Sequence, residues 1–179
     1  KLLETGELPA SKESAIRGGI GEMLLHANCL NEDRDCEACE FESECIVQRR
    51  MDSKFEFKPV FMTRGDSVGY VIECEDYRKE FHQGDVLRCN ILLFGKNIAY
   101  ISQYVQAMVE LGENGLGSRS LKFRVAEVRN IKNQVLYDGK RIDKKTCQFE
   151  KVQDYVMRRK LELEEKGLEN VMVFHTPLT

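Results

Sequence analysis

The stretch Leu111–Phe123, LGENGLGSRSLKF, predicts a change from helix to strand and decides how the chain folds on either side of it. Upstream, apolar residues recur at three- and four-residue steps from Ile98 to Leu111, the spacing of an amphipathic helix that ends at Gly112. Downstream, apolar and basic residues alternate in LKFRVAEV (121–128), as in a half-buried strand with positive charge on its outer face.

The glycines of this stretch have two interpretations. Glycine lacks a Cβ atom, so another backbone can approach it closely and its neighbours' amide N–H groups can face an anion. The alternative is a helix stop followed by a flexible connector, because glycine is common just past helix ends. Under the first interpretation, a phosphate cradle consists of Gly112, Gly115, Gly117, Ser118, Arg119 and Lys122.

Length and composition predict one ordinary globular core. The chain has 179 residues, of which 42% are hydrophobic and 32% are charged. The net charge of -3 argues against a protein covered with basic surface, so any contact with nucleic acid requires a local patch. No apolar run approaches the roughly 18 residues of a membrane span, and no signal peptide is visible. A soluble, cytoplasmic protein is expected.

The predicted elements follow the order strand, helix, strand, strand, helix, strand. The first strand and a loop occupy residues 1–14, with Ser11 or Ser14 expected to cap a helix that runs through residues 14–30. This order is that of the ferredoxin-like (βαββαβ) fold, an α+β architecture with an antiparallel sheet and its helices on one face. Strands are expected at FKPVF (57–61) and VGYVIEC (68–74), joined as a hairpin by a turn near Arg64 to Ser67, and at VLRCNILLFG (86–95). The segment DYRKEFHQGD (76–85) is expected to be a polar connector.

Beyond the second helix and its strand, a further strand is expected, with a turn at Asp138-Gly139 and a helix from about Lys151 to Lys166. The last residues, VMVFHTPLT (171–179), resemble a strand that begins as the chain ends. More polypeptide is therefore expected to follow, with residues 168–179 as its start.

Four cysteines lie close together in an acidic segment, at positions Cys29, Cys36, Cys39 and Cys45. A CxxC pair with one further cysteine on each side can surround a tetrahedral ion, and four thiolates close the coordination sphere. We therefore expect a metal knuckle at residues 29–45 that holds a structural Zn²⁺ ion. An iron–sulfur cluster is the alternative metal centre, and free thiols in a loop are the alternative without metal. Each of the other three cysteines is expected to be a small buried hydrophobic residue: Cys74, Cys89 and Cys147.

Several segments together, in order, resemble the CRISPR-associated RAMP endoribonucleases that cut repeat RNA into guide units. They are RGGIGEML (17–24), the C(x6)CxxC(x5)C set, GDVLRCNILLFG (84–95), LGENGLGSRSLKFRV (111–125) and FHTPL (174–178). The resemblance implies a ferredoxin-like RNA-binding fold, usually two such halves in tandem, with a glycine-rich loop at the RNA. Residues 1–179 would then form one RAMP domain with the metal knuckle, and 168–179 would begin the second half.

The resemblance also implies an activity. Members of that family cleave RNA without a catalytic metal, and the 2′-hydroxyl attacks the adjacent phosphate to leave a 2′,3′-cyclic phosphate. Histidine suits acid and base roles because its pKa lies near neutrality, and His26 lies in the region where some relatives keep a catalytic histidine. Its alternative role is that of an ordinary helix histidine. Whether the chain is an enzyme stays open: the other functions are a non-catalytic RNA-binding subunit of a CRISPR ribonucleoprotein complex, and a zinc-stapled scaffold that binds protein.

The cations expected to contact RNA phosphates lie at helix starts and after the glycines. Helix N-termini, amides and cations together favour phosphate, although a scattered Lys or Arg is more often solvated surface. The proposed groove is lined by Arg17, Lys96, Arg119, Lys122 and Arg124. The expected partners are repeat-derived RNA and other CRISPR effector subunits, with no membrane and no small-molecule substrate.

Overall fold

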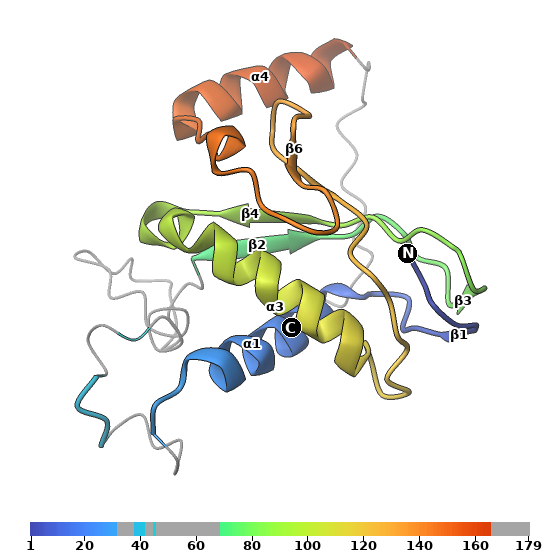
Figure 1. Ribbon diagram of the computed structural model, residues 1–179. Helices are drawn as coiled ribbons and strands as arrows, with labels where there is room; N and C mark the ends of the chain where they lie inside the picture. The colour runs from blue at the N-terminus through green and yellow to red at the C-terminus, as the bar shows by residue number, and fades with distance from the viewer. Residues whose placement is uncertain (32–37, 42–44, 46–68, 166–179) are drawn as a thin grey trace, which may run out of the picture.

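A computed structural model of the chain describes residues 1–31, 38–41, 45 and 69–165 (Figure 1). These residues form a mixed α+β structure with small antiparallel sheets and three α-helices, as the α+β prediction requires. The strands are β1 (Gly6–Glu7), β2 (Tyr70–Glu73), β3 (Glu80–Phe81), β4 (Asn90–Leu93), β5 (Val128–Arg129) and β6 (Val135–Tyr137). The helices are α1 (Glu13–Asn28), α3 (Ile101–Asn114) and α4 (Val152–Glu165), with 3₁₀ turns η2 (Gly95–Tyr100) and η3 (Lys144–Thr146).

The core forms where α1 packs against α3 and both cover β2 (Figure 1). Gly19 of α1 faces Leu111 of α3 so closely that a Cβ at position 19 would collide with the leucine side chain. This close approach explains why a helix rich in glycine is stable here. The core residues are Leu2, Leu8, Ile16, Ile20, Met23, Leu24, Tyr70, Ile72, Phe81, Tyr104, Ala107, Leu111, Leu116 and Leu121.

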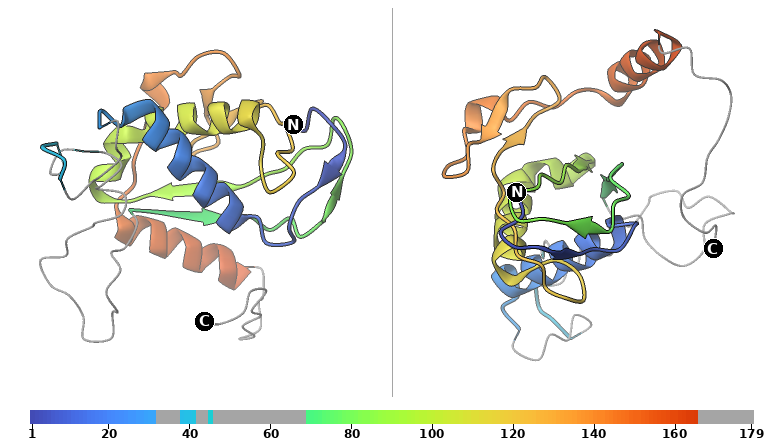
Figure 2. Two further views of the ribbon diagram at one scale, coloured as in Figure 1. Left: turned by 90° about the horizontal axis from the view of Figure 1, so that it is seen from below. Right: turned by 90° about the vertical axis from the view of Figure 1, so that its right-hand side faces the viewer.

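The N-terminal strand lies between two segments that are distant in the sequence. On one side, β1 pairs with β3 in antiparallel register, Gly6 opposite Phe81, and the pairing extends to Leu2, whose amide donates to the Asp85 carbonyl at 2.8 Å. On the other side, Leu2 forms an antiparallel bridge with Phe123, and Leu3 donates to the Lys122 carbonyl at 2.9 Å. The other strand pair in this part of the molecule is β2 with β4, also antiparallel. Figure 2 shows β1 and β3 together at one end of the α1 and α3 pair.

The end of the second helix differs from the prediction. Helix α3 continues through Gly112 to Asn114, and Gly112 is buried within it. A Cβ at position 112 would meet the carbonyl oxygen of Phe123, so this glycine serves a close approach of two backbones rather than a helix stop. The helix ends at Gly115, whose φ of 99° lies in the region that only glycine adopts easily.

Two local predictions near the first helix are also wrong. Lys12, not Ser11 or Ser14, occupies the N-cap position, and the Ser11 hydroxyl donates to the Glu13 carboxylate at 2.6 Å. The segment 76–85 is more than a polar connector, because it contains β3 and the fully buried Phe81. A two-residue strand carries too short a pattern to be recognised, and only its pairing with β1 defines it.

The C-terminal part follows the prediction more closely. Strands β5 and β6 form a hairpin, and the Asp138 carboxylate accepts the amides of Lys140 and Arg141 in the expected turn at Gly139. Helix α4 covers nearly the predicted range, has no buried residue and lies away from α1 and α3 in Figures 1 and 2. The predicted strand at 57–61, the predicted strand that begins at 171 and the proposed second half from 168 lie outside the described residues. No helix within the described ranges is both long and apolar enough to cross a membrane.

Candidate functional site

The glycine turn, residues 115–120, is the best-defined of the predicted features. Its ends are closed by two backbone hydrogen bonds between Leu116 and Leu121, at 2.9 and 3.0 Å, and Ser120 donates to the Gly117 carbonyl at 3.0 Å. A Cβ at Gly115 would collide with the backbone of Ser120, and Gly117 also has a positive φ, 77°. The turn is therefore a fixed structure that requires glycine, and not a loose connector.

Three successive amides of the glycine turn lack an acceptor within the described part of the chain. Among the described residues, nothing accepts a hydrogen bond from the backbone N–H of Gly117, Ser118 or Arg119. Ser118 and Arg119 are exposed at the surface. Successive amides at a turn can form a concave site that binds an anion, and each charged hydrogen bond of this kind contributes about 1.5–3 kcal/mol.

Cations and carboxylates lie beside these amides. The Arg119 guanidinium pairs with the Glu7 carboxylate of β1 at 3.0 Å, and both side chains are more than half exposed. An exposed pair of this kind contributes only about 0–1 kcal/mol, so a phosphate can compete for the guanidinium. Lys122 and Arg124 are exposed in the segment that follows, where the structure has isolated bridges at Leu121 and Phe123 in place of the strand predicted at 121–128. Neither side chain forms an ion pair with any described residue.

The remaining predicted cations lie elsewhere. Arg17 of α1 lies over the Tyr70 ring at 5.3 Å, and Tyr70 packs edge-on against Tyr104 of α3. Lys96 lies in η2, which leads into the N-terminal end of α3. The glycine turn follows the other end of α3, about 21 Å away for a helix of this length. The structure thus divides the predicted RNA-binding residues into two groups, one at each end of α3.

The predicted catalytic and metal residues lie at the end of α1. His26 is exposed in the last turn of the helix. Cys29 follows directly, and its thiol donates to the Asn31 carbonyl at 3.4 Å. Cys39 and Cys45 are half-buried, whereas Cys36 lies outside the described residues. Among the described residues no three Cys, His, Asp or Glu side chains form a group that could hold a metal, so the four-cysteine knuckle stays a prediction.

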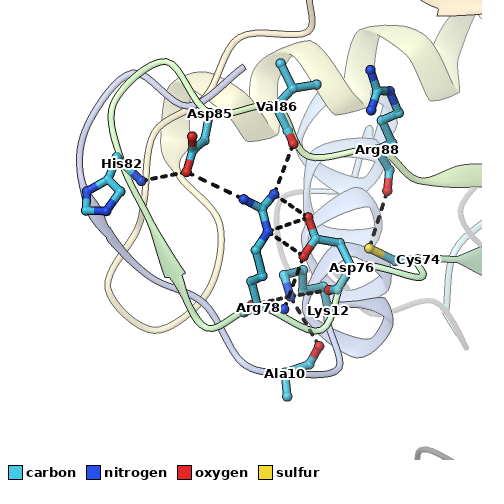
Figure 3. Close-up of polar contacts among 9 residues, drawn as sticks. All are labelled: Ala10, Lys12, Cys74, Asp76, Arg78, His82, Asp85, Val86 and Arg88. Atoms are coloured by element: carbon cyan, nitrogen blue, oxygen red, sulfur yellow. Dashed lines mark hydrogen bonds and ion pairs between the residues drawn. The ribbon is translucent and has the colours of Figure 1, made fainter.

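The structure also contains a polar cluster that the sequence pattern does not predict (Figure 3). The Lys12 side chain is completely buried, and its ammonium donates to the carbonyl oxygens of Ala10 at 3.2 Å, Asp76 at 2.5 Å and Arg78 at 2.8 Å. It also lies 5.3 Å from the centre of the Phe81 ring. Burial lowers the pKa of the Lys12 ammonium. Lys12 therefore fixes the segment between β2 and β3 to the start of α1.

Arg78 forms the outer half of this cluster. Its guanidinium donates three hydrogen bonds to the Asp76 carboxylate, at 3.0, 3.3 and 2.7 Å. The same guanidinium lies over the Phe81 ring, 4.8 Å from its centre. The hydrogen bond from Arg78 is the main cause that lowers the pKa of Asp76. An open depression beside it is lined by two acidic and two basic residues, Glu75, Asp76, Arg78 and Arg88, together with Tyr77 and Val86. Its balanced charges select neither an anion nor a cation.

Comparisons with known proteins identify one family. The sequence profile AF_1859_N, described as an N-terminal domain, matches residues 1–151, which is more than four fifths of the chain. The matched range includes α1, α3 and the glycine turn and ends just before α4. No curated protein and no solved structure matches the chain.

Proposed function

Since the chain belongs to the AF_1859_N family of N-terminal domains, we propose a function from the geometry of this domain: it binds RNA, and the RNA is of the CRISPR repeat type. The glycine turn would hold one phosphate, and the segment 121–124 that follows would hold the next. The observation that supports this most is the row of three amides, at residues 117–119, that have no acceptor among the described residues. Because the turn needs glycine at two positions, its amides are held in place before any ligand binds.

The proposal includes a ferredoxin-like arrangement of the strands. The segment 121–124 hydrogen-bonds to 1–3, residues 2–8 hydrogen-bond to 79–85, and β2 pairs with β4. If residues 79–93 are treated as one bent strand, the four strands in chain order are 1–8, 69–74, 79–93 and 121–124. Their pairs place them across the sheet in the order fourth, first, third, second, which is the strand order of the ferredoxin-like fold. The buried side chains of β2 and β3, and those of Leu2 and Leu8 on either side of β1, belong to one core with α1 and α3, which supports helices on one face of the sheet.

RNA binding is the first candidate function in this proposal, and RNA cleavage is the second. The glycine turn, GLGSRS, contains no His, Asp or Glu, so it can hold a phosphate but supplies no acid or base with a pKa near neutrality. Cleavage to a 2′,3′-cyclic phosphate would need His26 or another group brought to the RNA. A chain that holds RNA as a subunit of a CRISPR ribonucleoprotein complex needs no such group, and we retain cleavage as the second candidate.

A binding experiment tests the first proposal. The full chain is mixed with labelled single-stranded repeat RNA in EDTA, and retention is measured over a range of salt concentrations. We compare the double variant Lys122→Gln/Arg124→Gln with Lys132→Gln/Lys140→Gln, which removes two exposed cations, one between β5 and β6 and one in the turn after β6. The first variant should weaken binding at least about tenfold and reduce the slope of log affinity against log salt by about 1.4. Equal losses in the two variants, or no retention by the native chain, would refute the proposed surface.

The same incubation separates binding from cleavage. New ends that carry a cyclic phosphate in EDTA support the endoribonuclease, and His26→Ala should then abolish the product without reducing retention. Protection of intact RNA supports the RNA-holding subunit. Cleavage that persists in His26→Ala would remove this histidine from the catalytic role.

We also propose that Cys29, Cys36, Cys39 and Cys45 hold a structural Zn²⁺ ion. Four thiolates match the ligand set of structural zinc sites, and the ion would fold the acidic segment 29–45. Elemental analysis of the purified chain should find about one zinc per chain, and a chelator should release it together with four reactive thiols. A chain with no metal and with all seven of its cysteines reactive would exclude the knuckle.

A further inference from the structure

Two cysteines outside the proposed metal site face each other across β2 and β4. In this pair Glu73 lies opposite Asn90, so the next residues, Cys74 and Cys89, occupy the next opposite positions. The amide of Phe94 donates to the Gly69 carbonyl at 2.8 Å, which makes that pair a hydrogen-bonded one. Because hydrogen-bonded and non-hydrogen-bonded pairs alternate along an antiparallel ladder, the cysteine pair is of the non-hydrogen-bonded type.

Side-chain contacts confirm that the two cysteines are close. The Cys74 thiol donates to the carbonyl oxygen of Arg88, the neighbour of Cys89, at 3.5 Å (Figure 3). Cys74 is 4% exposed, and Cys89 is partly buried against the same core. The two side chains therefore lie on one face of the strand pair, toward α1. Burial, followed by the neighbouring Cys74, raises the pKa of Cys89 to about 11.

We propose that Cys74 and Cys89 form a site of reversible oxidation, where a disulfide links β2 to β4. In a non-hydrogen-bonded pair the Cα atoms lie about 4.5 Å apart, which is at the short end of the range that disulfides span. The chemistry is thiol exchange with a low-molecular-weight disulfide. One thiolate attacks that disulfide and releases one thiol, and the second cysteine then attacks the mixed disulfide and releases the other. Both cysteine protons leave, two electrons pass to the small disulfide, and one S–S bond forms in the protein.

The surroundings of the pair decide how such a bond would behave. A buried thiol with a raised pKa is mostly protonated at neutral pH, so the pair resists exchange until the oxidant is abundant. Cys74 is followed two residues later by Asp76, whose carbonyl accepts a hydrogen bond from the buried Lys12. A bond between the two cysteines would thus link β2 to β4 at the end that adjoins the segment held by Lys12.

The full chain, reduced and then exposed to oxidised glutathione in mildly alkaline buffer, provides the test. The product is denatured, its remaining thiols are alkylated, and its peptides are identified by mass spectrometry. The peptide pair linked through Cys74 and Cys89 should be the main internal disulfide, and a reductant should reverse it. The same oxidation in urea is the reference, because an unfolded chain with seven cysteines distributes its disulfides over many pairs.

Either of two results would overturn the proposal. One is a native product in which Cys74 and Cys89 are linked no more often than in urea. The other is a stable glutathione adduct on either cysteine with no internal bond. Cys147→Ser serves as the matched control, since it removes another half-buried cysteine and should leave the Cys74–Cys89 product unchanged. Cys89→Ser should eliminate it.

Discussion

Replacing Lys12 with methionine is expected to destabilise the domain by about 3 kcal/mol. The native ammonium makes three hydrogen bonds to carbonyl oxygens, of Ala10, Asp76 and Arg78. Methionine has a similar length, but it cannot donate to the three oxygens and does not place a charge over the Phe81 ring. The change therefore isolates the polar contribution of the side chain.

The magnitude follows from the number of bonds and the cost of burying their donor. A hydrogen bond to a charged group contributes about 1.5–3 kcal/mol, so three bonds give a gross sum of about 4.5–9 kcal/mol. The lowered pKa of Lys12 shows that burial of the ammonium opposes this gain. Water can also reach some of the carbonyl oxygens after the substitution, and neighbouring bonds are not additive. These reductions leave about 3 kcal/mol, or a decrease in Tm of about 6–12 °C for a domain of this size.

Urea unfolding followed by far-UV circular dichroism measures the effect. The midpoint should fall while the slope with urea stays unchanged, because the folded core is the same. Lys79→Met is the matched control, since Lys79 lies in the same segment, is exposed, and should change stability by less than about 0.5 kcal/mol. A loss for Lys12→Met below about 1 kcal/mol, or one equal to that of the control, would contradict the role of the buried ammonium.

Three other predictions concern single residues. Gly112→Ala should destabilise the fold by about 2 kcal/mol despite alanine's better helix propensity, because the new Cβ meets the Phe123 carbonyl oxygen. Gly18→Ala in α1, where the Cβ would enter open space, should instead stabilise the fold by up to about 1 kcal/mol. Thermal melts of the two variants compare these effects. Glu7→Gln should strengthen RNA binding about twofold to fivefold at low salt, because Arg119 loses its carboxylate partner, and a decrease would place Arg119 outside the interface. The pKa of Cys89 is raised from 9.0 to about 11, so the folded state keeps the thiol proton to higher pH than the unfolded chain does. The contribution of Cys89 to the free energy of unfolding is therefore complete below pH 9 and declines by at most about 2.7 kcal/mol as the pH rises toward 11. Urea unfolding at several alkaline pH values should show a smaller decline for Cys89→Ala.

Periodicity in the sequence predicted the helices well, because the apolar residues that pack one face of a helix lie three and four positions apart along the chain. Helices α1 and α4 begin and end close to their predicted limits. The same reasoning placed the end of α3 at Gly112, whereas the helix continues to Asn114. A glycine near a helix end serves as a stop or as a place for close packing, and only the position of Phe123 distinguishes these two roles.

The candidate site shows the same division. The glycines and basic residues of 111–124 are visible in the sequence, and so is their suitability for a phosphate. The sequence did not show that Arg119 pairs with Glu7, or that Arg17 lies over the Tyr70 ring. Nor did it indicate the buried Lys12, since a lone lysine before a helix carries no pattern that distinguishes it from a solvated one.

Sequence alone was thus sufficient for elements whose stabilising partners are near neighbours along the chain: the amphipathic helices and the turn at Asp138-Gly139. The tertiary structure decided which segments lie beside the first eight residues, namely 79–85 and 121–124. Hydrogen bonds between strands are made by backbone amides and carbonyls, which nearly all residues share. The amino-acid sequence therefore gives little information about which distant strands pair. Their partners become known only when the packed core brings the strands together.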